Sequence, residues 1–169
     1  MKIYVAAASS EIERAEKWIA ALREAGFEVV STWPEVIRQV GQANPMQASR
    51  EDRAGWAAED LSQVATAEVF WFLLGKPTAG AYTEFGYALF LGAMSQEARL
   101  AGVNAPIYRL LTSGTETSIF TALAIHFETD EKAFEALKVQ LNFERMAQKN
   151  KSPGVSSEAS SQQLPSEGG

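Results

Sequence analysis

The sequence predicts a single-domain α/β protein with a doubly wound, flavodoxin-like sheet of five parallel strands. Short apolar runs typical of strands alternate along the chain with longer segments of helical periodicity, as in right-handed β–α–β units. Residues 69–74 are apolar without interruption, as expected for a central strand that is covered on both faces. The length of 169 residues is sufficient for one domain with a substantial core.

The first half of the chain shows clear helix boundaries. Gly26 follows an apolar helical pattern at the position of a C-terminal cap. Ser49, with Asp52 three residues later, is typical of the residue that precedes a helix. The expected strands are residues 3–7, 27–30 and 69–74, the expected helices are 11–25 and 49–65, and a short helical piece is expected at 35–40.

The second half continues the alternation and then changes composition. Its last stretch consists mainly of Ser, Gln, Gly, Pro and Glu, which cannot bury enough apolar surface to offset the entropy of ordering. We therefore predict a domain over residues 1–148 and a disordered tail over 149–169. The expected elements are a loop at 75–81, helices at 82–94 and 130–148, and strands at 106–111 and 124–127.

Composition excludes several classes of protein. The net charge of −6 argues against an electrostatic nucleic-acid binder, and the lack of cysteine excludes disulfides, zinc knuckles and thiol catalysis. The single histidine, His126, supplies neither a multi-histidine metal site nor a catalytic triad, so we expect no metal. No apolar run is long enough for a membrane span, and no signal peptide is recognisable, so we predict a soluble cytoplasmic protein.

Candidate polar residues gather in two loops. In a doubly wound sheet, ligands bind beyond the carboxyl ends of the strands, where the strand order reverses. If the first and third strands are neighbours, residues 6–10 and 75–83 meet at that point. Their hydroxyl groups suit a sugar or a phosphate, although loops and caps are rich in Ser and Thr for other reasons. The hydroxyl residues are Ser9, Ser10, Thr78 and Thr83.

Glu84 is the first candidate for chemistry. We place it in the first turn of the helix expected over 82–94, where the helix dipole and free N–H groups favour its charged form. An ionised carboxylate in a dry pocket can act as a nucleophile toward a sugar carbon. The alternative is an acidic residue that merely suits a helix start.

Two further residues are candidates for the same pocket. Asp60 shares a helix face with the apolar Trp56, so its carboxylate requires either a function or an ion pair, for which Arg50 and Arg53 are available. Tyr4 lies in the first strand, where its ring suits the core. Its buried hydroxyl would still require a partner, and a carboxylate would serve.

Several familiar motifs are absent from the sequence. No Gly-x-Gly-x-x-Gly follows the first strand, and no Walker loop occurs. The first strand runs into three alanines, without the acidic residue of a phospho-accepting receiver domain.

Three segments resemble the nucleoside 2-deoxyribosyltransferase family, which includes the 2′-deoxynucleoside 5′-phosphate N-hydrolases. They are Ile3-Tyr4-Val5-Ala6, then Asp60-Leu61-x-x-Val64 before an apolar strand, then Gly80-x-x-x-Glu84-x-Gly86-Tyr87-Ala88. The resemblance covers about residues 1–140 in element order and spacing. It implies a flavodoxin-like fold, a homodimer or higher homo-oligomer, and cleavage of the N-glycosidic bond of a nucleoside or nucleotide without a metal or other cofactor.

The resemblance also implies roles for single residues. Glu84 would attack the anomeric carbon, Asp60 would hold the sugar or assist the leaving base, and Tyr4 would position the nucleophile. In relatives, the region that corresponds to residues 112–123 reaches a neighbouring subunit's pocket, for which Ser118 and Phe120 are the candidates here. The alternative is ordinary loop and helix structure. The residues implied to bind the substrate are Ser9, Ser10, Thr78, Gly80 and Ser118.

One departure from the transferase pattern favours hydrolysis over transfer. Transferases of the family tend to carry an aspartate where this chain has Thr78, whereas the nucleotide hydrolases have a hydroxyl residue that helps to hold the 5′-phosphate. The first loop is rich in alanine and lacks the arginine expected at a strong phosphate site. The sequence alone does not decide whether Arg14, one helical turn further along, reaches this loop.

Two other functions stay open on the sequence alone. A nucleotide-binding sensor or regulator without turnover would explain the alanine-rich first loop. An oligomeric interaction module that uses the sheet only as a scaffold is also compatible with this fold.

Overall fold

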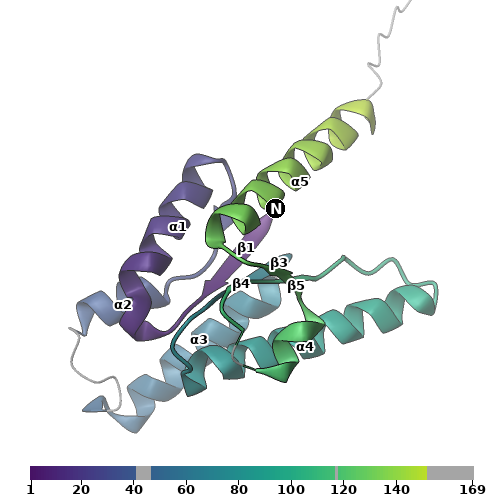
Figure 1. Ribbon diagram of the computed structural model, residues 1–169. Coiled ribbons are helices and arrows are strands. Elements are labelled where there is room, and N and C mark those ends of the chain that lie inside the picture. The colour runs from purple at the N-terminus through teal and green to yellow at the C-terminus, as the bar shows by residue number, and fades with distance from the viewer. Residues whose placement is uncertain (41–46, 117, 152–169) are drawn as a thin grey trace, which may run out of the picture.

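The computed structural model describes residues 1–40, 47–116 and 118–151, and its sheet confirms the predicted fold class (Figure 1). Five parallel strands lie in the order β2-β1-β3-β4-β5. β1 and β3 are therefore neighbours in the middle of the sheet, and the strand order reverses there. The strands are β1 (Lys2–Ala6), β2 (Glu28–Val29), β3 (Val69–Leu74), β4 (Arg109–Gly114) and β5 (Ile125–Phe127).

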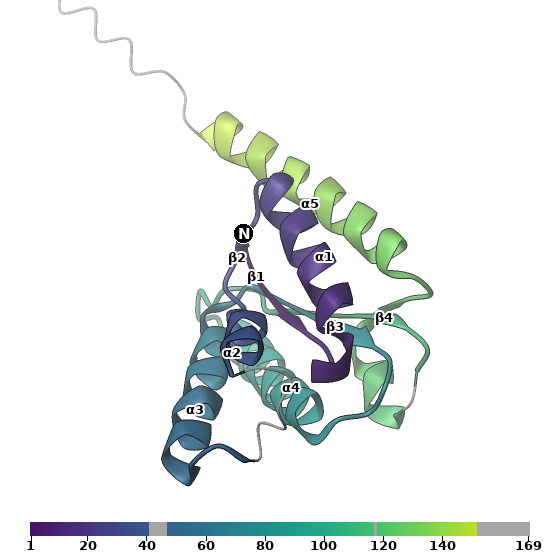
Figure 2. The ribbon, with the colours of Figure 1, turned by 90° about the vertical axis from the view of Figure 1, so that its left-hand side faces the viewer.

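Helices cover both faces of the sheet. Figure 1 and Figure 2 show α1 and α5 on one face, α3 and α4 on the other, and α2 near the edge of the sheet where β2 lies. The helices are α1 (Ile12–Glu24), α2 (Trp33–Gln39), α3 (Arg50–Thr66), α4 (Ala79–Leu100) and α5 (Asp130–Lys151), with the 3-10 helices η1 (Ser9–Glu11) and η3 (Ile119–Leu123).

The core is built around β3, whose six residues are all buried. Phe70 of β3 stacks on Tyr4 of β1 with ring centroids 5.7 Å apart. Phe85 of α4 packs against Phe70 and Phe72 at 6.1 and 5.6 Å. These rings fix α4 to the middle of the sheet, beside the end where β1 and β3 stop.

The end of β1 is completed by side chains, because β2 has only two residues and pairs with β1 only at Lys2 and Ile3. Further along, the Val5 N–H donates to Ser31 Oγ at 2.6 Å. The indole N–H of Trp33 donates to the Val5 carbonyl at 2.8 Å. These two bonds replace the missing strand partner and fix the start of α2 against β1.

The start and end of α4 differ from the prediction. The helix covers Ala79–Leu100, whereas we expected residues 82–94. Gly80 favours a loop by propensity, but Ala81 and Phe85 in the first turns are buried against the rest of the molecule. Tertiary packing of the helix thus overrides the local preference.

β4 also lies three residues later than predicted, at Arg109–Gly114 instead of 106–111. Pro106 has no N–H to donate to a strand ladder. The strand instead continues through the polar Thr112 and Ser113, because both hydroxyls are buried and hydrogen-bonded. These two polar residues lie beyond the predicted end of the strand, yet they are fully buried within it.

Other local predictions agree with the structure. Ser49 caps α3 by accepting from the Asp52 N–H at 3.0 Å, and Gly26 has a φ of 89° after the end of α1. The helical piece expected at 35–40 is α2, which begins two residues earlier, at Trp33.

The predicted tail is described only at its beginning. Residues 149–151 form the end of α5, and the rest of the tail lies outside the described residues. None of the described helices is both long enough and apolar enough to cross a membrane. The cytoplasmic location stays a prediction.

Candidate active site

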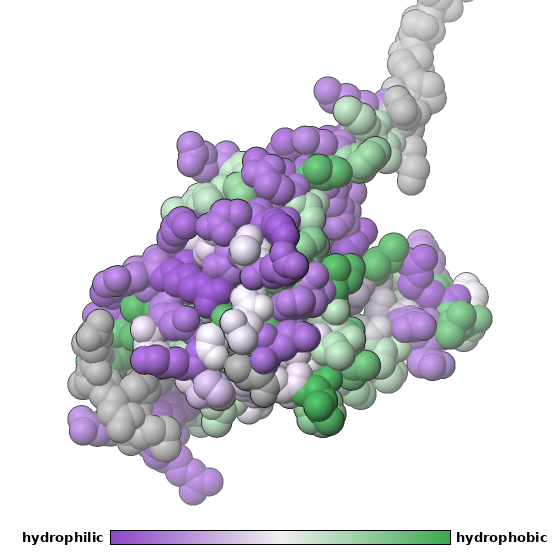
Figure 3. All heavy atoms as spheres, in the orientation of Figure 1, coloured by the Kyte–Doolittle hydropathy of each residue, from purple (hydrophilic) through white to green (hydrophobic). Residues whose placement is uncertain are grey.

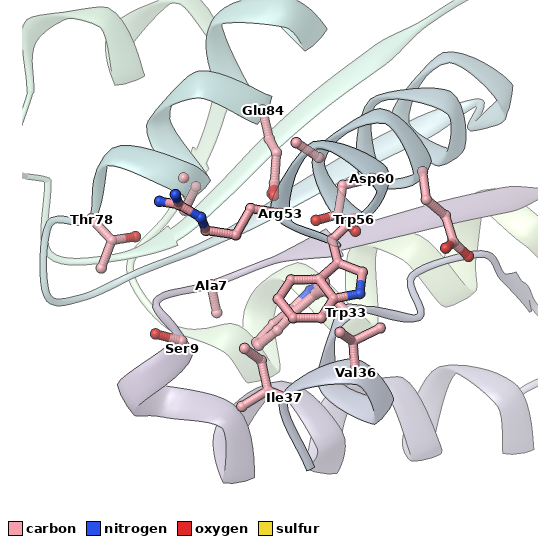
Figure 4. Close-up of a pocket in the computed structure, with 14 residues that line it drawn as sticks. Ala7, Ser9, Trp33, Val36, Ile37, Arg53, Trp56, Asp60, Thr78 and Glu84 are labelled. Atoms are coloured by element: carbon pink, nitrogen blue, oxygen red, sulfur yellow. The ribbon is translucent and has the colours of Figure 1, made fainter. Parts of the chain in front are cut away.

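A pocket opens beyond the carboxyl ends of β1 and β3, where the two candidate loops meet (Figure 4). Its volume of about 430 Å³ lies within the usual range of small-molecule sites. The lining residues are Ala7 and Ser9 after β1, Trp33, Val36 and Ile37 of α2, Arg53, Trp56, Ala57, Glu59 and Asp60 of α3, and Thr78, Gly80, Ala81 and Glu84 at the start of α4.

Most of the residues proposed from the sequence come together in this pocket. Figure 4 shows Glu84 and Asp60 extending into it from two different helices. The binding candidates that line it are Ser9, Thr78 and Gly80. Segments separated by about seventy residues of chain thus form one site, as the predicted topology requires.

Three hydroxyl candidates do not line the pocket. Ser10 is exposed within η1, and Thr83 is exposed and bonded to its own helix. Ser118 precedes η3, where its Oγ accepts from the Phe120 N–H at 3.2 Å. Within the described chain, Ser118 therefore has a local capping role.

Glu84 lies in the second turn of α4 instead of the first, because the helix begins at Ala79. The expectation that the helix start favours its charge is wrong. Burial in the apolar pocket, followed by the negative charge of Asp60, raises the pKa of Glu84 to about 8. At neutral pH this carboxyl group is mostly protonated.

The charged form of Asp60 is also disfavoured. Burial and the neighbouring Glu59 raise its pKa to about 6. A structural ion pair with an arginine would move the pKa in the opposite direction, and no arginine is among the causes of the shift. Between pH 6 and 8, Asp60 is mainly charged and Glu84 mainly neutral, which is typical of carboxyl pairs with unequal roles.

Tyr4 of β1 does not line the pocket, but its hydroxyl is close enough to Glu84 and Asp60 for their charges to act on it. Its side chain is fully buried, and its hydroxyl makes no hydrogen bond of ordinary geometry. The group is nevertheless close enough to interact with Glu84: Tyr4 lowers the pKa of Glu84, whereas burial, Glu84 and Asp60 raise the pKa of Tyr4. The three groups are therefore electrostatically coupled, and the orphan hydroxyl is available to a Glu84 carboxylate.

An aromatic and aliphatic wall was not identified from the sequence. Trp33, Val36 and Ile37 of α2 and Trp56 of α3 line one side of the pocket. Trp56 shares the helix face of Asp60, so its position in the pocket can be predicted from the sequence. The position of Trp33 cannot, because its orientation depends on a hydrogen bond to the distant Val5 carbonyl.

A polar side complements this wall. Arg53 extends from α3 toward the side of the pocket where Thr78 lies (Figure 4). Thr78 precedes α4 without capping it by its side chain, and the first N–H groups of a helix lack intrahelical partners. These donors, with Ser9, suit an anionic or hydroxyl-rich part of a ligand.

Arg14 is not part of the pocket. Its guanidinium binds Asp130 through two bonds of 2.7 and 2.6 Å and donates to the Leu74 carbonyl at 2.8 Å. Arg14 therefore does not supply a cation to the loop after β1, because these bonds direct it toward α5 and away from the pocket lining. Among the residues that the structure describes, no three His, Cys, Asp or Glu side chains are grouped so that they could hold a metal ion.

Sequence comparison gives no relatives: no protein-family model matches the chain, and no curated protein matches it. The structure, however, is similar to a 2-deoxyribosyltransferase from the psychrotolerant bacterium Bacillus psychrosaccharolyticus, with a TM-score of 0.55 and 18% identity over 82% of this chain and 90% of that one. It is also similar to a CMP N-glycosidase of Clostridium botulinum, with a TM-score of 0.50 and 16% identity over 82% of this chain and 99% of that one. This chain shares the flavodoxin-like fold of these two proteins.

Proposed function

We propose that this protein cleaves the N-glycosidic bond of a 2′-deoxynucleoside or its 5′-monophosphate, with Glu84 as the nucleophile. The observation that carries the proposal is the buried Glu84 carboxyl group facing the pocket beside a second carboxyl group, Asp60. The names of the two proteins of similar fold, a deoxyribosyltransferase and a CMP N-glycosidase, support the same bond as the target.

The proposed reaction has two displacements at the anomeric carbon. A Glu84 carboxylate oxygen bonds to this carbon while its bond to the base nitrogen breaks, and the base leaves with the electron pair and gains a proton. Water or a second base then attacks the same carbon, and the ester bond to Glu84 breaks. The carboxylate is regenerated, and the attacking group loses its proton.

Asp60 and Tyr4 support this step. We assign to Asp60 either the sugar hydroxyls or the proton of the leaving base, because a pKa of about 6 leaves part of the group protonated near neutrality. We assign to Tyr4 the positioning of the ionised nucleophile, since its unpaired hydroxyl can donate to a Glu84 carboxylate.

The two sides of the pocket match the two ends of a nucleotide. A flat base packs against Trp33 and Trp56, since aromatic rings supply apolar contact and stacking. Arg53, Thr78, Ser9 and the start of α4 face the sugar or the 5′-phosphate. This cation and the hydroxyl at position 78 favour a phosphorylated substrate and hydrolysis over base transfer.

Chromatography of a panel of nucleosides and 5′-monophosphates, with and without a free acceptor base, tests the proposal. Release of base without acceptor identifies a hydrolase, whereas exchange only with acceptor identifies a transferase. Stabilisation of the protein by a nucleotide in a thermal shift, without product after long incubation, would instead support a nucleotide sensor.

We also propose that the chain is a homo-oligomer. All twelve exposed large hydrophobic side chains of the described residues lie between residues 90 and 146. Figure 3 shows hydrophobic surface gathered on the side of the molecule where α4 and η3 lie. Leu123 and Ile125 there line a groove together with Leu89 and Ala93 of α4. Apolar surface of this kind marks an interaction site, and a second copy of the chain is the proposed occupant.

A further inference from the structure

Glu11 joins the two loops that form the polar side of the pocket. We infer that Glu11 is a positioning residue that sets the spacing between the loop carrying Ser9 and the loop carrying Thr78. Glu11 does not itself line the pocket. The kinetic part of this inference rests on the proposed function, whereas its structural part does not.

The carboxylate of Glu11 bridges two segments separated by 65 residues. Its Oε2 accepts from the Lys76 backbone N–H at 3.2 Å. Its Oε1 accepts from Arg14 at 3.2 Å, and Arg14 also donates to the Leu74 carbonyl. The residues on both sides of Gly75 are thus bound to the start of α1, directly or through Arg14.

Gly75 is the position that makes this approach possible. A Cβ atom at residue 75 would lie 2.1 and 2.4 Å from the two carboxylate oxygens of Glu11. These distances are far below van der Waals contact. Any larger residue at 75 therefore displaces the Glu11 carboxylate, although the backbone of this glycine imposes no positive φ.

The other end of the bridge is firmly held. Asp130 binds Arg14 through both carboxylate oxygens and also accepts from Trp18 and Ser113 at 2.8 and 2.6 Å. Burial alone would raise the pKa of Asp130, but the hydrogen bonds from Arg14, Ser113 and Trp18 lower it on balance. Arg14 is therefore an anchored cation, and Glu11 is the link from this anchor to the loop after β3.

The bridge controls the loops and not the nucleophile. Ser9 lies two residues before Glu11, and Thr78 lies three residues after Gly75. Glu84 is held separately, because the adjoining Phe85 is buried against the aromatic core. Loss of the bridge should therefore weaken ground-state binding and leave the chemical step largely intact.

Four variants test this inference: Glu11→Ala, Glu11→Gln, Gly75→Ala and the double variant Glu11→Ala/Gly75→Ala. We expect KM to rise about tenfold in Glu11→Ala and Gly75→Ala, with kcat within about twofold of the parent. Glu11→Gln retains one acceptor for the Lys76 N–H and should recover most of the affinity. The double variant should match Glu11→Ala alone, because Gly75→Ala acts only by displacing that carboxylate.

The exposed Glu13→Ala variant is the matched control and should leave KM unchanged. A merely structural role would lower the fraction of folded protein, so that kcat fell at constant KM. That pattern, or additive effects in the double variant, would overturn the inference.

Amide hydrogen exchange of Gly75, Lys76 and Thr78 supplies a readout that needs no substrate. Exchange should be faster in Glu11→Ala and Gly75→Ala than in the parent and in Glu13→Ala. Unchanged exchange would refute the bridge even if the protein cleaves nucleotides. Faster exchange in a protein that cleaves no nucleoside or nucleotide would support the bridge and count against the proposed function alone.

Discussion

At the scale of single residues, two carboxyl groups that line the pocket, Glu84 and Asp60, and the buried Tyr4 hydroxyl near them all lie where their charged forms are unfavourable. Burial is the largest cause of the raised pKa for Glu84, Asp60 and Tyr4 alike. Nearby carboxylates add to it: Glu59 acts on Asp60, Asp60 acts on Glu84, and both Glu84 and Asp60 act on Tyr4. Glu84 and Asp60 were identifiable from their motifs and helix face. Their protonation was not, because it depends on which distant segments exclude water from the pocket.

The pH dependence of activity follows from the pKa of Glu84. If the ionised form is the nucleophile, kcat/KM of the parent should rise with pH and level off above about 8.

Tyr4→Phe removes the hydroxyl that lowers the pKa of Glu84, so the pH profile of this variant should move toward higher pH. Its free energy of unfolding should change by less than about 1 kcal/mol, because no hydrogen bond is lost. An unshifted profile would show that Tyr4 does not act on the nucleophile.

Glu84→Gln should stabilise the protein at alkaline pH. The folded-state pKa of about 8 lies above the ordinary value of 4.5, so the folded state binds more protons than the unfolded state between these values. Stability therefore falls as pH rises through this window. The variant should gain at least about 1 kcal/mol over the parent at pH 9 and match it near pH 4, as measured by denaturant unfolding. Equal stability of the variant and the parent at both pH values would contradict the burial of the Glu84 carboxyl group.

At the scale of secondary-structure elements, the pocket depends on connections that local sequence does not encode. The alternation of strands and helices follows from apolar patterning, and the cap of α3 follows from Ser49. The start of α4 and the register of β4 do not, since packing overrides Gly80 in one case and buried hydrogen bonds extend the strand in the other. The position of α2 is equally non-local, because Ser31 and Trp33 bind the backbone of β1.

Trp33→Phe tests this attachment of α2. The substitution leaves the buried Val5 carbonyl without its indole partner and should lower the free energy of unfolding by about 1–3 kcal/mol. Trp56→Phe is the matched control, because Trp56 lines the same pocket from the half-exposed face of α3. It should cost less than about 1 kcal/mol. Equal losses in urea unfolding would mean that packing, and not the hydrogen bond, fixes α2.

At the scale of the whole molecule, the pocket and the exposed apolar surface come from different parts of the chain. The pocket is formed by residues before position 85, whereas the exposed large hydrophobic side chains all follow residue 89 within the described part of the chain. Composition alone gives the fraction of hydrophobic residues but not which of them are exposed. This exposure depends on how β4, η3 and β5 pack beside α4, which composition does not encode.

Charged substitutions on this apolar face should dissociate the oligomer. Leu123→Asp and Ile125→Asp place a carboxylate in the groove beside α4, and light scattering after size exclusion should show a lower mass than for the parent. Ala20→Asp, on the exposed face of α1, is the control and should leave the mass unchanged. A parent chain that is monomeric at every concentration would contradict the proposed assembly.

The central claim is tested most directly by mass spectrometry of acid-quenched protein during turnover of a 2′-deoxynucleoside or its 5′-monophosphate. We expect the peptide containing Glu84 to gain the mass of the sugar, or of the sugar phosphate, with the ester on Glu84 itself. Glu84→Gln should show neither the adduct nor base release, with a loss of about a thousandfold or more in rate. Base release by Glu84→Gln at the parent rate, or an adduct on another residue, would contradict the account.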